Sequence, residues 1–382
     1  MLFRRSGYNL LVMISTNTYT PPANGFRTFL VVWVTQSISV LGSAMTFFAV
    51  TIWLAQMLYP NSGQKGQLSI ALSLVSLAYG LPNIFAAPLA GAWADRHDRK
   101  QIMMLMDFAS GLISLALTIL ILAYRLNLWL LIFVLVIHSI VSAFHFSAFD
   151  SSYAMLVPEK LLPRANGMMQ TITSLSNVIA PVIAASMIAL PALSRQGTIG
   201  GEVGRILTGL QTGIPLAIGV DAVTFFIASA TLLFLVIPSP QRVDLHPAGD
   251  QAKKSIWADI VEGMLYIWKR RPMLWLLGTF SLINFSSGVF VLQPLFVKFN
   301  LAPDWSGRGF SFETALALLA TVSGIGGVVG GVLISAWGGL KKRRIYGVVL
   351  PILAVLALMI VYGLSPWLYL TAAAGCLRTT PW

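Results

Sequence analysis

The chain has little charge and almost no cysteine. Of its 382 residues only 10% are charged, whereas 57% are apolar and the mean hydropathy is +0.79. A soluble domain needs more charge to cover its surface, so the lipid bilayer is the expected solvent for most of the chain. The single cysteine, Cys376, excludes an intramolecular disulfide and a cysteine-based metal site. The sequence also lacks a glycine-rich phosphate loop and a His/Glu metal cluster, so we predict no enzyme activity, no cofactor and no metal.

What the chain has instead is a series of long apolar runs. Inside lipid every backbone polar group must be satisfied within its segment, and runs of about 20 residues fit helices, not short barrel strands. We therefore predict an all-α membrane protein with about nine or ten transmembrane helices. The expected spans are residues 28–57, 68–94, 102–124, 128–150, 165–191, 214–237, 273–299, 311–338, 345–364 and a run that starts at 367.

The basic residues lie between the apolar runs and indicate the topology. Eighteen Lys and Arg residues fall in the segments of one side, and six fall in the loops of the other side. Positive residues concentrate on the cytoplasmic side of membrane proteins, which predicts a cytoplasmic N-terminus. This placement also argues that the net charge of +12 serves topology, not nucleic-acid binding.

The longest polar connection divides the chain into two groups of spans. We predict a disordered tail over residues 1–24, a six-helix bundle over 25–237, a cytoplasmic linker over 238–272 and a partial second bundle over 273–382. Between Ser255 and Lys269 apolar residues recur at helical spacing, which predicts an amphipathic helix at the membrane surface. A helix that docks a partner protein is the alternative interpretation.

Residues 90–100 and 334–344 form an internal repeat with an offset of 244 residues. Each copy closes the second span of its half with Ala-Trp and a small residue, and then enters a basic loop. The same position in each half indicates a parallel repeat, as in transporters built from two similar bundles.

The first copy of the repeat resembles the loop 2–3 signature of the major facilitator superfamily, with the motif Gly91-x-x-x-Asp95-Arg96-x-x-Arg99-Lys100. The resemblance implies a gate in which the Asp pairs with Arg and faces a helix N-terminus of the second half, where both charges stabilise the carboxylate. The chain departs from the signature at Asp98, where the family usually has Gly. A basic loop without a gating role is the alternative.

Three further segments, residues 33–43, 144–167 and 219–225, are similar to the branch that holds macrolide-efflux and siderophore-export transporters. The resemblance covers residues 24–376. It implies a transporter of a bacterial inner membrane that exports amphiphilic small molecules by proton antiport and alternating access. Exporters of the superfamily tend to carry Gly-Pro-x-x-Gly-Gly in the fifth span. Here alanine replaces each glycine, in Ala180-Pro181-Val182-Ile183-Ala184-Ala185; this weakens the antiporter assignment but still allows close helix packing.

Polar groups within the spans are costly, so each is a functional candidate. The proton-coupling candidates are Asp107 in the third span and His138 and His145, which lie seven residues apart on one face of the fourth. Asp107 is either a proton carrier or an interfacial carboxylate paired with Arg99 or Lys100. Each histidine is either part of a proton relay or a hydrogen-bonded packing group.

Candidate substrate contacts are uncharged polar residues in the first, fifth and seventh spans, which line the central cavity in the superfamily: Gln36, Asn177, Asn284 and Gln293. An interhelical hydrogen bond is the alternative for each of them. Asp150 and Asp221 are interpreted as lying near span ends, where hydrogen bonding or capping is expected.

The second half is expected to end early. If it mirrored the first, two more spans and most of a third would follow Ala374, yet the last residues are polar. The alternative to an exporter is therefore a truncated remnant that does not transport, or a membrane assembly partner. An importer is the alternative within transport, since a fold alone does not set the direction.

Overall fold

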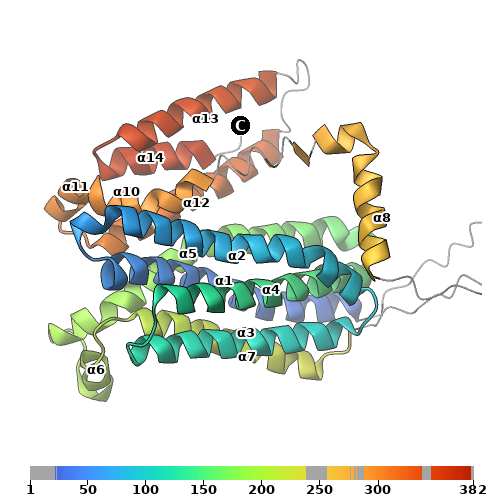
Figure 1. The fold of residues 1–382 in the computed structure, drawn as a ribbon, viewed down its shortest axis with the longest axis horizontal. Helices are drawn as coiled ribbons and strands as arrows, with labels where there is room; N and C mark the ends of the chain where they lie inside the picture. The colour runs from blue at the N-terminus through green and yellow to red at the C-terminus, as the bar shows by residue number, and fades with distance from the viewer. Residues whose placement is uncertain are drawn as a thin grey trace, which may run out of the picture.

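The computed structural model describes residues 22, 24–237, 256–275, 277–278, 281, 288–337 and 346–379. The first bundle consists of six long helices that run side by side (Figure 1). They are α1 (Gly25–Trp53), α2 (Lys65–Ala94), α3 (Arg99–Leu122), α4 (Leu128–Leu156), α5 (Leu162–Arg195) and α7 (Ile214–Phe234). Helix α1 continues into one π-helical turn, η1 (Leu54–Leu58), and the short helix α6 (Gly201–Thr208) lies at one end of the bundle.

The second bundle lies along α2 and α5 (Figure 1). Its described elements are η4 (Gly288–Leu292), α10 (Gln293–Phe299), α11 (Ala302–Gly307), α12 (Phe312–Trp337), α13 (Tyr346–Leu364) and α14 (Leu368–Thr379). Helix α12 packs against α5 on one side and against α14 on the other, and α13 packs on α14. At Gly324 a Cβ would lie 2.6 Å from the side chain of Val178, so the small residue permits the close crossing of α12 and α5.

Helix α8 (Ile256–Trp268) stands across the ends of the long helices and contacts α2 (Figure 1). The predicted linker helix is therefore present, with bounds within one residue of those expected. Its described side chains include exposed apolar groups, among them Met264 and Trp268. Its location at the membrane surface stays a prediction. The expected N-terminal tail lies almost entirely outside the described residues.

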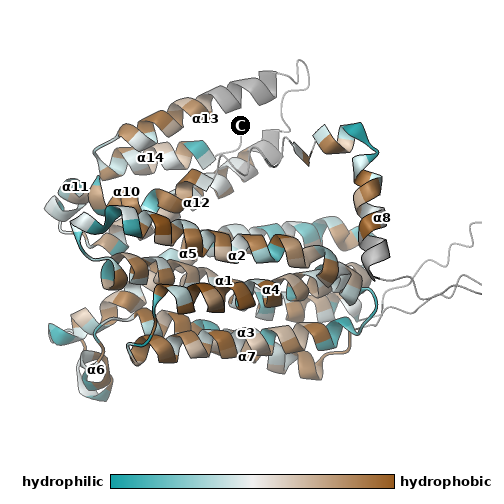
Figure 2. Cartoon of the chain, viewed as in Figure 1, coloured by the Kyte–Doolittle hydropathy of each residue, from teal (hydrophilic) through white to brown (hydrophobic). Residues whose placement is uncertain are grey.

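Seven helices in the described residues are long and apolar enough to cross a bilayer, and two shorter apolar stretches cover Gly288–Phe299 and Ala354–Leu364. Figure 2 shows apolar residues along the bodies of the helices, while hydrophilic residues gather at the turns. The predicted all-α membrane class is confirmed. Helix α3 begins at Arg99 because the Asp98 carboxylate accepts hydrogen bonds from the backbone N–H groups of Lys100 and Gln101, at 2.9 and 3.4 Å.

The two ends of the molecule are packed differently. At the end that holds α6, one hydrophobic core combines both bundles, with Leu54 and Ile214 from the first and Leu316 and Leu368 from the second. At the opposite end, which holds the turn between α2 and α3, a second core is built by the first bundle, around Phe29 and Leu156. We call these the α6 end and the loop 2–3 end.

Candidate functional site

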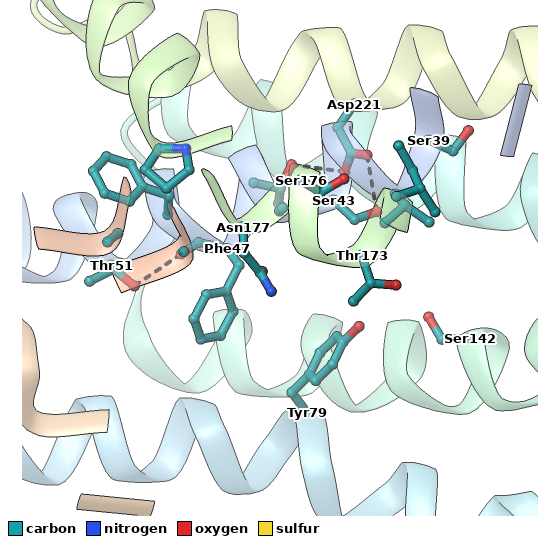
Figure 3. Close-up of a pocket in the computed structure, with 18 of the residues that line it drawn as sticks. Ser39, Ser43, Phe47, Thr51, Tyr79, Ser142, Thr173, Ser176, Asn177 and Asp221 are labelled. Carbon is teal, nitrogen blue, oxygen red and sulfur yellow. Dashed lines mark hydrogen bonds between the residues drawn. The ribbon is translucent and has the colours of Figure 1, made fainter. Parts of the chain in front are cut away.

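A cavity of about 750 Å³ lies between the two bundles. One wall comes from α1, α2, α3, α4, α5 and α7, and the other from η4, α10, α12 and α14. The lining is mostly apolar and aromatic, with polar groups at intervals; Figure 3 labels Tyr79, Ser142, Thr173, Asn177 and Asp221 among them. A concave, largely apolar site with a few polar groups is the usual form of a binding site for a small organic molecule.

Asp107 and His145 form a buried pair beside this cavity. The Asp107 side chain is fully buried, and its Oδ1 lies 3.0 Å from Nε2 of His145. Its other oxygen, Oδ2, accepts a 2.7 Å hydrogen bond from Nε2 of Gln36 on α1. His145 and Gln36 both line the cavity. Three sequence-predicted residues from α1, α3 and α4 are thus brought together, although two of them were predicted for proton coupling and one for substrate.

One proton on this pair decides its net charge. With the imidazole protonated and the carboxylate ionised, the pair is neutral; without that proton it leaves an uncompensated anion in a region of low dielectric, which is costly. The predicted alternative, a carboxylate paired with Arg99 or Lys100, is wrong in its partners. Asp107 lies about two turns inside α3, whereas Arg99 hydrogen-bonds the carbonyl oxygen of Ser151 at 3.0 Å and Lys100 that of Leu233 at 3.2 Å.

His138 lies two turns from His145 on α4 and has a different environment. Its ring stacks on Tyr79, with centroids 6.1 Å apart, and meets the edge of Phe225 at the same centroid distance. Both histidines line the cavity, so the expectation that they share one helix face agrees with the structure. The aromatic contacts of His138 fit a packing role, and the carboxylate contact of His145 fits proton binding.

Asp221 is a buried carboxylate whose position the sequence analysis predicted wrongly. Instead of lying near a helix end, it lies about two turns inside α7 and is 1% exposed. Its carboxylate accepts hydrogen bonds from Thr46 at 2.8 Å and from Ser114 at 2.9 Å. It accepts a third from Ser43 at 3.3 Å (Figure 3). The signal was present in the sequence as one acid inside a long apolar run, but its partners come from two distant helices.

The remaining substrate candidates are placed as follows. Asn177 of α5 is exposed to the cavity, and Gln293 at the start of α10 lines it from the second bundle. Asn284 lies outside the described residues. In the alanine-rich fifth-span segment Ala180 and Ala184 are fully buried, and Pro181 borders the cavity.

The gating motif lies at the loop 2–3 end, where α2 turns into α3. Asp95 caps the end of α2, and its Oδ1 lies 3.4 Å from Nη2 of Arg99. The Asp95 side chain is 72% exposed, while that of Arg99 is 10% exposed and tied to α4. Gly91 faces Ser147 with room for a Cβ at 3.8 Å, and Arg96 continues the turn by a backbone bond to Trp93. Residues 338–345, which hold most of the second copy of the repeat, lie outside the described ranges.

The cavity between the bundles, the buried Asp107–His145 pair and the loop 2–3 motif together are features of a membrane transporter. In the part of the chain that the structure describes, His, Cys, Asp and Glu do not gather in groups of three that could hold a metal ion. The family described as Major Facilitator Superfamily matches residues 32–378, and the chain therefore belongs to that superfamily.

Relatives of known name are similar over much of the chain. Macrolide efflux protein A of Streptococcus pyogenes is 26% identical over 320 residues, covering 82% of this chain and 68% of that protein. Macrolide efflux protein A of Enterococcus faecalis is 27% identical over 280 residues, covering 72% and 75%. The uncharacterised transporter YkuC of Bacillus subtilis is 29% identical over 311 residues, covering 79% and 64%.

Solved structures share the fold at low identity. A bacterial homologue of the human lysosomal transporter Spinster, in an inward-facing and unoccupied conformation, has a TM-score of 0.60 at 15% identity, covering 95% of this chain and 74% of that one. A D-xylose-proton symporter has a TM-score of 0.52 at 13% identity, covering 91% and 79%.

Proposed function

We propose that this chain is a secondary active exporter of amphiphilic small molecules that works by proton antiport and alternating access. The observation that carries the proposal is the Asp107–His145 pair, which borders a largely apolar cavity of about 750 Å³. The apolar and aromatic lining fits an amphiphile, and the pair fits a proton. The names of the macrolide-efflux relatives support the direction.

The geometry supports competition between proton and substrate. Gln36 contacts Asp107 and also lines the cavity, so a solute that binds Gln36 acts on the carboxylate directly. Binding that favours the unprotonated pair releases a proton, and protonation restores the neutral pair and disfavours the solute. Two ligands that each bind one state better are coupled reciprocally, which is the thermodynamic basis of antiport.

The charge bias supports a topology with the N-terminus and the loop 2–3 end in the cytoplasm of a bacterial cell and the α6 end outside. The core that joins both bundles then closes the outer end, and the cavity opens inward. Helix α8 lies at the inner membrane surface, where Lys269, Arg270 and Arg271 follow its apolar residues.

Transport into proteoliposomes tests this function. The full chain is reconstituted, a proton gradient directed out of an acidic vesicle lumen is imposed, and movement of rhodamine 6G, a fluorescent amphiphile, is followed. We expect uptake by protein in the inside-out orientation that collapses with a protonophore. It should be lost in Asp107→Asn, since an amide does not compensate the charge of a protonated His145. Asp95→Asn tests the gate: we expect it to lose transport while the Asp107–His145 pair still binds its proton.

The matched control is Ser152→Ala, a serine of α4 that is 2% exposed and lies away from the cavity lining. It should transport at the wild-type rate. Gradient-independent movement of the dye would indicate a facilitator, and no movement from folded protein would favour an assembly partner; either result contradicts the proposed antiport.

A further inference from the structure

A second buried carboxylate, Asp221, lies on the same seam of helices as the Asp107–His145 pair. Helix α1 links them: Gln36 contacts Asp107, and Ser43, seven residues further along, contacts Asp221. At 1.5 Å per residue this separates the two contacts by about 10 Å along the helix axis. Ser114 of α3 lies the same seven residues beyond Asp107. The two carboxylates therefore occupy successive levels of one α1–α3–α7 interface.

Small polar residues fill the seam between these levels. Ser39 is 2% exposed and donates to the carbonyl oxygen of Thr224 at 3.2 Å, and Ser110 is 2% exposed on α3. Both line the cavity, as does Asp221. The path from one carboxylate to the other is thus bordered by hydroxyl groups and by the cavity, not by a closed apolar barrier.

The helices approach each other unusually closely at Asp221. A Cβ on Gly42 would lie 2.8 Å from Oδ1 of Asp221 and 3.0 Å from its Cα. Glycine at this position allows α1 to bring two hydroxyl groups, from Ser43 and Thr46, to the carboxylate. The carboxylate is consequently held by donors on α1 and α3 while it belongs to α7.

The partners of Asp221 are suited to both of its protonation states. All three are hydroxyl groups, which donate to an ionised carboxylate but can also turn and accept a bond from a carboxylic acid. A hydroxyl that turns in this way can direct its own hydrogen to a carbonyl oxygen one turn back on its helix. A cationic partner would hold the carboxylate in the ionised form alone, and these contacts impose no such restriction.

The titratable groups that face Asp221 are few. Tyr79 of α2 lies across the cavity and His138 of α4 stacks on Tyr79 and touches Phe225, one turn from Asp221. The charged residues of the helices packed against α7 lie at other levels: Arg27 on α1; Arg99, Lys100 and Asp107 on α3; Arg164 and Arg195 on α5. Burial of the carboxylate without a cation in these contacts makes its ionised form costly.

We propose that Asp221, with Ser43, Thr46 and Ser114, is a second proton-binding site of this transporter, distinct from the Asp107–His145 pair. The carboxylate takes up one proton through the cavity to give the neutral acid, and releases it to give the ion, with no other bond made or broken. The transport role of the site rests on the proposed antiport, and a cycle that uses both sites moves two protons.

Infrared difference spectroscopy of the full chain tests the site without a substrate. A buried carboxyl that gains a proton produces a C=O stretching band of its own during a pH titration. We expect such a band in the wild type, kept in Asp107→Asn and lost in Asp221→Asn, because the proton of the Asp107–His145 pair lies on the imidazole. A titrating spectrum that is identical in the wild type and in folded Asp221→Asn would show that Asp221 holds one protonation state, and would overturn the proposal.

Ser114→Ala provides a second, milder test. It removes one donor from the ionised carboxylate, so the midpoint of the Asp221 band is expected to move to higher pH. Ser152→Ala, a buried serine of α4 outside this seam, should leave the midpoint in place. If Asp221 holds one protonation state, no midpoint is observed in either protein, and the proposal is wrong. If the Asp221 band behaves as expected but the dye is not transported, the proton site stands and the proposed antiport fails.

Discussion

Lys298 of α10 donates a 2.6 Å hydrogen bond to the carbonyl oxygen of Tyr59, and so ties the second bundle to the end of the first. The same ammonium group also donates to the carbonyl oxygen of Ala55, inside the π-helical turn. Carbonyl groups at a helix C-terminus lack partners within the helix and carry the negative end of its dipole, which favours a cation there. Gln56 adds a 2.7 Å bond to Glu313 of α12 at the same end.

Loss of this contact should open the α6 end. In Lys298→Met we expect the equilibrium to shift toward the state open at that end by roughly tenfold or more, because a hydrogen bond to a charged group contributes about 1.5–3 kcal/mol. The measurement is labelling of Thr51→Cys, in a Cys376→Ser background, by a membrane-impermeant maleimide added from the α6 side. Arg205→Met, at an 84% exposed position of the same end, is the control. Equal labelling of Lys298→Met and the control would contradict the closing role.

Gly42 should tolerate no side chain. Alanine there would place its Cβ 2.7 Å from Oγ1 of Thr224 and 3.0 Å from the Asp221 backbone, so α1 and α7 must move apart. We expect a loss of about 1–3 kcal/mol of stability, which is the usual cost of overpacking, measured by thermal unfolding in detergent. Gly80→Ala is the control, because nothing lies within 4 Å of its added Cβ. A Gly42→Ala protein as stable as Gly80→Ala would refute the close approach.

Asp98 should stabilise the start of α3. Asp98→Ala removes the acceptor for the N–H groups of Lys100 and Gln101, and we expect it to cost about 1 kcal/mol. Asp98→Asn keeps an acceptor oxygen and should recover most of the thermal stability. Glycine, the usual residue of the family motif here, should fall between them. Equal melting temperatures for Asp98→Ala and the wild type would show that the cap contributes nothing.

Asp304 should make the packing of α14 sensitive to acid. Its carboxylate accepts two 3.0 Å hydrogen bonds from Arg308 and a 2.8 Å bond from the backbone N–H of Leu368, at the start of α14. The Arg308 bonds first, and the Leu368 bond second, hold the pKa of Asp304 below its usual range.

The sign of the effect follows from that lowered pKa. The contribution of Asp304 is present above the unfolded pKa of about 3.9 and is lost as the pH falls through the lower folded pKa. The difference in melting temperature between the wild type and Asp304→Asn should therefore be full near neutral pH and should vanish in strong acid. A difference that is independent of pH would exclude this linkage.

The course of the helices could be read from the sequence because it depends on local chemistry. An apolar run must form its own backbone hydrogen bonds in lipid, so the predicted spans and the structure agree to within a few residues for α1, α2, α3 and α7. The predicted end of the fourth span at residue 150 is too early. Helix α4 continues to Leu156, because polar residues such as Ser152 bond back to carbonyl oxygens of their own helix.

The candidate site was only partly predictable. Asp107, His145 and Gln36 were each identified as polar groups within apolar runs, since such groups are costly in lipid wherever they lie. Their association was not, because 71 residues separate Gln36 from Asp107 and nothing local reports which helices meet. The role of Asp221 was missed for the same reason, because its three hydroxyl partners belong to other helices.

The sequence by itself determined the membrane environment, the helices and the superfamily, through hydropathy, charge bias and motif. Only the tertiary structure decided that His145, and not Arg99, faces Asp107, and that Lys298 binds the end of α1. Those choices depend on the rotation and crossing of packed helices, which a close approach at residues such as Gly42 sets and which no single segment encodes.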